Sequence, residues 1–134
     1  MKTIEERFSI AVGAALAFAA PAFGGGPSLA MLDQLERGNW ELRERGGQQQ
    51  QICVPDGHQL IQLRHPGAQC SLFVIEDTAS QVVVQYTCSG RGYGRTQIRR
   101  ETNRLVQIDS QGVVDGYPFD VSAEARRVGP CSPR

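Results

Sequence analysis

The chain has 134 residues, the length of a single domain, and its 14 basic residues balance 14 acidic ones. This even balance gives no reason to expect nucleic acid or an anionic membrane as a partner. Fifteen glycines and seven prolines predict many turns and little helix. The composition therefore favours a small domain built mainly from short strands.

Residues 1–22 have the three-part order of an export signal. A short region with two basic residues is followed by an apolar run, and Ala20-Pro21-Ala22 matches the small-x-small cleavage rule. The apolar run is shorter than the roughly 18 residues that a spanning helix needs. A buried N-terminal helix is the alternative interpretation. We predict a signal peptide cleaved before Phe23, a periplasmic or secreted address, and no transmembrane segment after its removal.

Residues 23–37 are predicted to form a flexible leader followed by one short helix. Gly24 to Pro27 suit a mobile chain. We expect Ser28 to cap the helix and Gly38 to end it. An apolar stripe at a spacing of three supports the helix: Leu29, Leu32 and Leu35.

The domain itself is predicted to cover residues 38–131, with a tail at 132–134. Alternating apolar and polar residues indicate strands at 39–44 and 48–54. Residues 58–64 are expected to form one or two helical turns, which Pro66-Gly67 ends.

Residues 70–88 are rich in β-branched and aromatic side chains and predict a β-hairpin with a polar tip at 77–81. Folding this stretch symmetrically about Ala79 brings three pairs opposite one another: Leu72 with Tyr86, Val74 with Val84, and Cys70 with Cys88. Both faces of the hairpin carry apolar residues. We therefore expect the helix near residue 60 or a curled sheet to cover the second face.

Beyond the hairpin, residues 90–94 are expected to be a loop, because glycine recurs at every second position. A second hairpin is predicted at 95–109, followed by a type I turn at Asp109–Gly112. Strands continue to Cys131, with a bend or break at 116–118. The fold class is mainly β: an antiparallel meander of about seven strands, as a twisted sheet or half-barrel, with one or two short helices.

Four cysteines in an exported chain predict two disulfides, involving Cys53, Cys70, Cys88 and Cys131. Three connectivities are possible. We favour Cys53–Cys70 with Cys88–Cys131, which closes one local loop and ties the C-terminus to the central hairpin. The pair Cys70–Cys88 also stays open, because these two residues face each other across the hairpin.

The order of these features resembles a family of small exported proteins of Gram-negative bacteria known only as a domain of unknown function (DUF three-six-one-seven). The matching residues are Gly38-x-Trp40-Glu41, the four cysteines in order, and the closing segment from Ala123 to Cys131, with glycine two residues before the last cysteine. The resemblance covers residues 38–131. It implies compartment and architecture, and no activity.

Candidate chemistry is sparse. Cys53, His58, His65 and Cys70 form a C-x4-H-x6-H-x4-C array, but its spacing fits no usual zinc pattern and export favours disulfides over thiolates. No nucleophile elbow or zinc-protease motif is present. We therefore assign no catalytic residue, metal ligand or cofactor. An alternative interpretation is a small hydrolase or metal-dependent enzyme using Asp56, His58 and His65.

Five arginines fall between residues 91 and 104. Strand alternation places Arg95 and Arg99 on the face opposite Arg100, which splits the group. We predict one surface for an anionic ligand: Tyr93, Arg95, Arg99 and Arg104. The competing interpretation is a solvated strand face whose arginines pair with neighbouring carboxylates.

Taken together, the sequence predicts an exported binding or envelope-associated module without catalysis. Its expected partner is an envelope component or another exported protein, and not nucleic acid.

Overall fold

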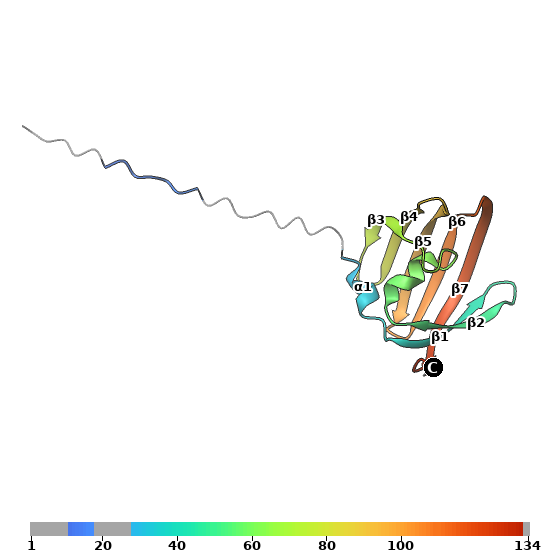
Figure 1. Ribbon diagram of the computed structural model, residues 1–134. Coiled ribbons are helices and arrows are strands. Elements are labelled where there is room, and N and C mark those ends of the chain that lie inside the picture. Colours follow the sequence, from blue (N-terminus) through green and yellow to red (C-terminus); the bar gives the residue numbers. More distant parts are fainter. Residues whose placement is uncertain (1–10, 18–27, 133–134) are drawn as a thin grey trace, which may run out of the picture.

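The structure is a computed structural model that describes residues 11–17 and 28–132 (Figure 1). Of the predicted signal peptide it describes only residues 11–17, which form neither helix nor strand. The predicted cleavage site, the leader up to Pro27 and the last two residues lie outside the described ranges.

One antiparallel sheet of seven strands makes up most of the domain, as predicted: β1 Gly38–Glu44, β2 Gln49–Val54, β3 Cys70–Asp77, β4 Gln81–Cys88, β5 Gly92–Thr102, β6 Leu105–Val114 and β7 Tyr117–Gly129. A short helix, α1 (Ala30–Asp33), precedes the sheet, and a 3-10 helix, η1 (Gly57–Gln62), lies between β2 and β3. The mainly β fold class is therefore confirmed.

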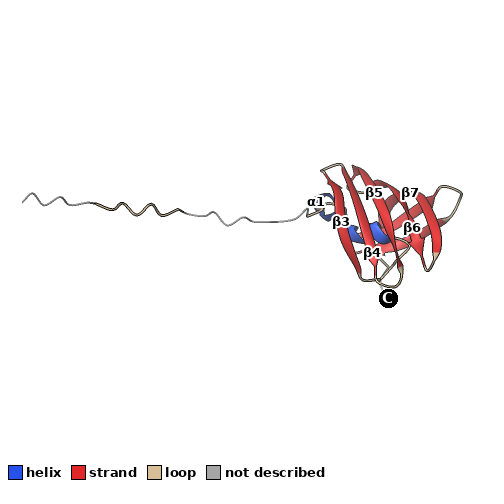
Figure 2. Ribbon diagram, turned by 90° about the horizontal axis from the view of Figure 1, so that it is seen from above, coloured by secondary structure: helices blue, strands red, loops and turns tan. Residues whose placement is uncertain are grey.

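The strands lie in the order β2-β1-β7-β6-β5-β4-β3. From β3 to β7 each strand pairs with the next along the chain, and the hairpin β1–β2 joins this meander through β7. β2 and β3 follow each other in the chain, separated by η1, but they therefore lie at opposite edges of the sheet. The sheet curves around η1, which rests against its inner side (Figures 1 and 2).

The hairpin formed by β3 and β4 has the register that symmetry about Ala79 predicts. Cys70 pairs with Cys88, Leu72 with Tyr86, and Val74 with Val84. A β-bulge at Ile75 then shifts the register by one, so that Glu76 pairs with Val83.

The core lies between the inner side of the sheet and the two helices. Its largest fully buried side chains include Trp40 of β1, Tyr86 of β4 and Met31 of α1. η1 covers one face of the sheet, where it contributes buried Leu60 and Ile61 to the core. The expected cover over the second face of the 70–88 hairpin is not found at β3, because η1 and the curl of the sheet both lie on the same side. The outer face of the β3 edge stays open, with Phe73 exposed.

Two turn predictions are wrong. The expected type I turn at Asp109–Gly112 lies inside β6, where Ser110 pairs with Thr96 on one side and Val121 on the other. The expected loop at 90–94 is shorter, because β5 begins at Gly92. In both cases a neighbouring strand on each side supplies ladder hydrogen bonds, which outweigh the local turn preference of Asp and Gly.

The predicted helix at 28–37 is reduced to the four residues of α1. Ser28 is not its cap: Leu29 occupies that position in the left-handed conformation, without a side-chain cap. Its backbone N–H donates instead to the Asp77 carboxylate at 3.2 Å. Tertiary contacts with the β3 end, rather than local capping, therefore fix where the helix starts.

The favoured disulfide connectivity is also wrong. The bridges are Cys53–Cys131 and Cys70–Cys88. Asn39 of β1 pairs with Cys53 on one side and with Gly129 on the other, so the end of β2 and the end of β7 flank the start of β1. Cys131, two residues beyond Gly129, is then close enough to bond Cys53. Cys53 and Cys70 belong to opposite sheet edges, which rules out the local loop that we favoured.

Candidate functional site

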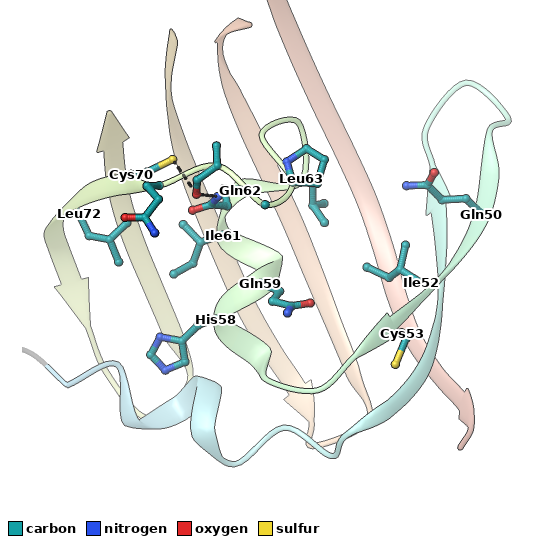
Figure 3. A pocket seen from close by; sticks show the side chains of 14 residues that line it. Gln50, Ile52, Cys53, His58, Gln59, Ile61, Gln62, Leu63, Cys70 and Leu72 are labelled. Atoms are coloured by element: carbon teal, nitrogen blue, oxygen red, sulfur yellow. Dashed lines mark hydrogen bonds between the residues drawn. The ribbon is translucent and has the colours of Figure 1, made fainter. Parts of the chain in front are cut away.

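Residues 54–69 cross the inner side of the sheet from one edge strand to the other, and we call this segment the strap. Both of its ends adjoin disulfides, because Cys53 is bridged to Cys131 and Cys70 to Cys88. Figure 3 shows η1, the helical part of the strap, between β2 and β3. The strap is thus a fixed cover rather than a free loop.

Sequence explains how the strap starts. The Asp56 side chain accepts a hydrogen bond from the His58 N–H at 2.9 Å and so caps η1. Gly57 is required because a Cβ there would collide with the Leu32 carbonyl of the α1 segment. This close approach brings the beginning of η1 against α1.

The middle of the strap is bonded to the sheet. The Thr96 hydroxyl donates to the Ile61 carbonyl, and it lies 2.7 Å from the Ser110 hydroxyl. Ile61 itself is buried in the core. A buried polar pair of this kind is stable only when its members are hydrogen-bonded, as they are here.

The end of the strap is held by His65, which is fully buried. Its Nε2 lies 3.0 Å from the Arg91 carbonyl, and its Nδ1 lies 2.9 Å from the Tyr86 hydroxyl. Because a carbonyl only accepts, Nε2 is the donor to Arg91, and in the tautomer with its proton on Nε2 the other nitrogen, Nδ1, accepts from the Tyr86 hydroxyl. His65 is therefore a structural residue.

Tyr86 lies under the strap on the inner face of β4. Its ring covers Gly94 of β5, where any Cβ would collide with it. Burial raises the pKa of the Tyr86 phenol above its ordinary value of 10.0, and a hydrogen bond with Ser110 offsets part of this rise. Glycine at position 94 thus makes room for the aromatic ring that anchors the strap.

A groove of about 680 Å³ runs over the strap between the two edge strands, and we call it the strap groove. Its lining includes aliphatic side chains and the amides of Gln50, Gln59, Gln62 and Gln69, with no lysine, arginine or carboxylate. Figure 3 shows the labelled side chains of η1 flanked by Gln50 and Ile52 of β2 and by Leu72 of β3. Gln62 is occupied, since its amide donates to the His65 and Ala68 carbonyls.

His58 lies at one end of the strap groove beside two carboxylates. Its Nε2 is 3.0 Å from Asp33 Oδ1 and 4.0 Å from Asp56 Oδ1. One ligand atom from each of the three residues lies within 4.8 Å of the others. Capping by Asp56 and the hydrogen bond to Asp33 already account for this arrangement. Sequence reasoning missed Asp33, because α1 and η1 meet only in the folded chain.

The three residues of the alternative enzyme hypothesis do not come together. Asp56 and His58 are neighbours at the start of η1, whereas His65 is bonded to Tyr86 and Arg91. All four cysteines are in disulfides, so no thiolate is available to a metal. Of Asp56, His58 and His65, the structure therefore brings together only Asp56 and His58.

The predicted anionic-ligand residues are spread along one strand and its turn. Tyr93, Arg95 and Arg99 are exposed on β5, and Arg104 lies in the turn that follows. Arg99 lies 3.9 Å from Glu101, and Arg104 lies 3.2 Å from Glu36. Binding of an anion by this surface stays a prediction.

The residues of the strap groove were not predicted as a site. Seven glutamines fall between residues 48 and 69, and this density was the available signal. The density of glutamines does not show that β2 and β3, at opposite edges of the sheet, line one groove together with the strap.

Comparisons with protein-family models, with curated proteins and with solved structures found no match to this chain. The resemblance to the exported four-cysteine family therefore stays a prediction. Among the described residues, no helix has the length and apolar character needed to cross a membrane.

Proposed function

We propose that the protein is an exported binding module without catalysis, and that it holds an uncharged, extended polypeptide segment in the strap groove. The predicted signal peptide and the two disulfides support export, since disulfides persist in oxidising compartments. The binding partner is accordingly an envelope component or another exported protein.

The chemistry of the strap groove carries this proposal. Its lining combines aliphatic side chains with amides, and amides both donate and accept hydrogen bonds as peptide groups do. Gln50, Gln59 and Gln69 are exposed, and their side-chain amides have no hydrogen-bond partner among the described residues. The lining contains no lysine, arginine or carboxylate, and the imidazole of His58 at its end is already hydrogen-bonded to Asp33, so the groove favours an uncharged ligand.

The filled interior supports a surface ligand rather than an enclosed one. Leu60 and Ile61 of the strap occupy the inner side of the sheet. Within the described residues, every buried side-chain nitrogen or oxygen has a hydrogen-bond partner. A small molecule inside the sheet would have to displace the strap, whereas the strap groove is open as it stands.

The proposal is tested with arrays of short synthetic peptides that differ in charge and apolar content. We expect binding to uncharged peptides with apolar side chains, and a loss of about tenfold or more in affinity in the variant Gln50→Glu/Gln59→Glu, because binding would then bury two exposed carboxylates without a partner. Gln111→Glu, an exposed amide outside the strap groove, is the matched control.

Peptide binding that the double variant leaves intact would place the ligand elsewhere. The absence of binding to any peptide of the array would reject the proposed ligand class.

A further inference from the structure

A hollow of about 630 Å³ lies on the outer side of the sheet, the side that faces away from η1, and we call it the outer hollow (Figure 2). Its floor is a row of residues that pair across β4, β5, β6 and β7: Tyr86, Gly94, Gly112 and Phe119. The rings of Tyr86 and Phe119 point to the inner side, where both lie against His65. These residues therefore contribute backbone rather than side chains to the floor.

Glycine is required at both of the central floor positions. A Cβ at Gly94 would collide with the Tyr86 ring, and a Cβ at Gly112 would collide with the Tyr93 carbonyl. The backbones of β5 and β6 therefore approach each other closely here, and neither glycine places a side chain in the hollow.

The walls of the outer hollow are built from the residues next to the floor, which point outward by strand alternation. One wall carries Thr87, Tyr93 and Val113, and the other includes Gln85, Arg95 and Asp120. A smaller hollow of about 270 Å³ adjoins the second wall and is also lined by Arg95 and Asp120. These two side chains can therefore contact successive units of one elongated ligand.

The polar groups of the second wall are not used by the fold. Arg91 and Arg99, which precede and follow Arg95 in the chain, lie 3.7 and 3.9 Å from carboxylates. Among the described residues, neither Arg95 nor Asp120 has an ion-pair or hydrogen-bond partner, although both are exposed. One is a donor only and the other an acceptor only. The wall thus offers two opposite charges to a ligand.

We propose that the outer hollow binds an uncharged oligosaccharide of at least two sugar units. Each sugar hydroxyl both donates and accepts hydrogen bonds, so one ligand can accept from Arg95 and donate to Asp120. An anion would meet the carboxylate, and a cation would meet the guanidinium. The ring of Tyr93, which is 55 % exposed, offers an apolar face to the C–H groups of a sugar ring. This proposal goes beyond the proposed function.

An extended peptide is less suited to this surface. β4, β5, β6 and β7 each have a strand on both sides, so their backbone donors and acceptors are used within the sheet. A peptide that adds to a sheet gains its affinity from free backbone groups at an edge. The apolar wall residues, Tyr93 and Val113, form a small platform beside a polar wall, which matches a ring with one apolar face and several hydroxyls.

An array of immobilised neutral, uronic-acid and amine-bearing oligosaccharides tests the proposal. We expect the native chain to bind neutral oligosaccharides, and Tyr93→Ala to bind them at least about tenfold more weakly. Tyr117→Ala is the matched control, because this tyrosine is 75 % exposed and lines neither hollow. Gln59→Glu, in the strap groove, should also leave this binding unchanged, so the test is independent of the peptide test.

The two charged residues give a readout that a folding defect would not produce. Asp120→Asn leaves the guanidinium unopposed, so we expect the preference to shift by about tenfold towards uronic-acid oligosaccharides. Arg95→Gln should shift it towards amine-bearing ones. No binding to any oligosaccharide, binding of the native chain to acidic ones alone, or equal binding by Tyr93→Ala and the native chain would overturn the proposal.

Nuclear magnetic resonance of the native chain provides the second measurement. Titration with neutral oligosaccharides of the array should shift the amide signals of Gly94 and Gly112, which form the floor of the outer hollow. Shifts confined to the strap would overturn the assignment of the ligand to this face.

Discussion

Tyr86 joins three parts of the molecule through one side chain. Its ring covers Gly94, and its hydroxyl donates to His65 at the end of the strap. Burial raises the pKa of the phenol above 10.0, because the charged form loses solvation. The Tyr86 hydroxyl therefore donates a hydrogen bond that the folded structure uses, and loss of its proton destabilises the folded state.

The alkaline stability of the protein should depend on Tyr86. A raised pKa in the folded state means that the unfolded chain ionises first, so stability is complete below pH 10 and falls as the pH rises above it. We expect Tyr86→Phe to lose about 1–2 kcal/mol at neutral pH, because His65 Nδ1 loses its donor, and to show a smaller further loss from about pH 9 to 11.

Urea unfolding at several pH values measures both effects. Tyr117→Phe, at an exposed tyrosine, should follow the native curve. Equal alkaline slopes for the native chain and Tyr86→Phe would show that the buried phenol does not set this pH dependence.

At the scale of elements, the strap covers the inner side of the curved sheet and connects its two edges. It buries Leu60 and Ile61, bonds to β5 through Thr96, and carries Arg64, which lies 2.8 Å from Glu44 of β1. It also forms the floor of the strap groove. Loosening the strap should therefore affect stability and ligand binding together.

Thr96→Val tests this coupling. The substitution leaves the Ile61 carbonyl without the Thr96 donor and removes one hydrogen bond of the Ser110 hydroxyl, so we expect a loss of about 1–3 kcal/mol and faster hydrogen exchange in η1 than in β6. Unchanged exchange in η1 would mean that this hydroxyl does not hold the strap.

At the scale of the whole molecule, each of the two disulfides attaches one edge strand of the sheet to another strand or to the C-terminal segment. Cys53–Cys131 joins residues 78 apart in the sequence, and Cys70–Cys88 joins residues 18 apart. Chain-entropy estimates then give about 4.5 kcal/mol for the first bridge and about 3 kcal/mol for the second. The longer bridge should contribute more, since it restricts more of the unfolded chain.

Replacing each pair with serine tests this order. We expect Cys53→Ser/Cys131→Ser to lower the free energy of unfolding more than Cys70→Ser/Cys88→Ser, measured by urea unfolding. Peptide mapping without reduction should recover Cys53 linked to Cys131. A Cys53–Cys70 peptide would contradict the pairing of β1 with both β2 and β7.

The sequence by itself determined the local parts of this protein. Alternation placed the strands, symmetry about Ala79 placed Cys70 opposite Cys88, and the even number of cysteines predicted two bridges. These features depend on side-chain period and on neighbours a few residues away, which a linear pattern records.

Only the tertiary structure decided the rest. The pairing of β1 with β7 brought Cys53 to Cys131, the crossing of the strap buried His65, and the approach of β2 and β3 to the strap formed the groove. Each of these features depends on which distant segments come into contact, and the same local sequence pattern is compatible with many different strand pairings. Burial and ladder hydrogen bonds across the whole sheet select among them, which is why the turn at Asp109–Gly112 and the cap at Ser28 were lost to longer-range contacts.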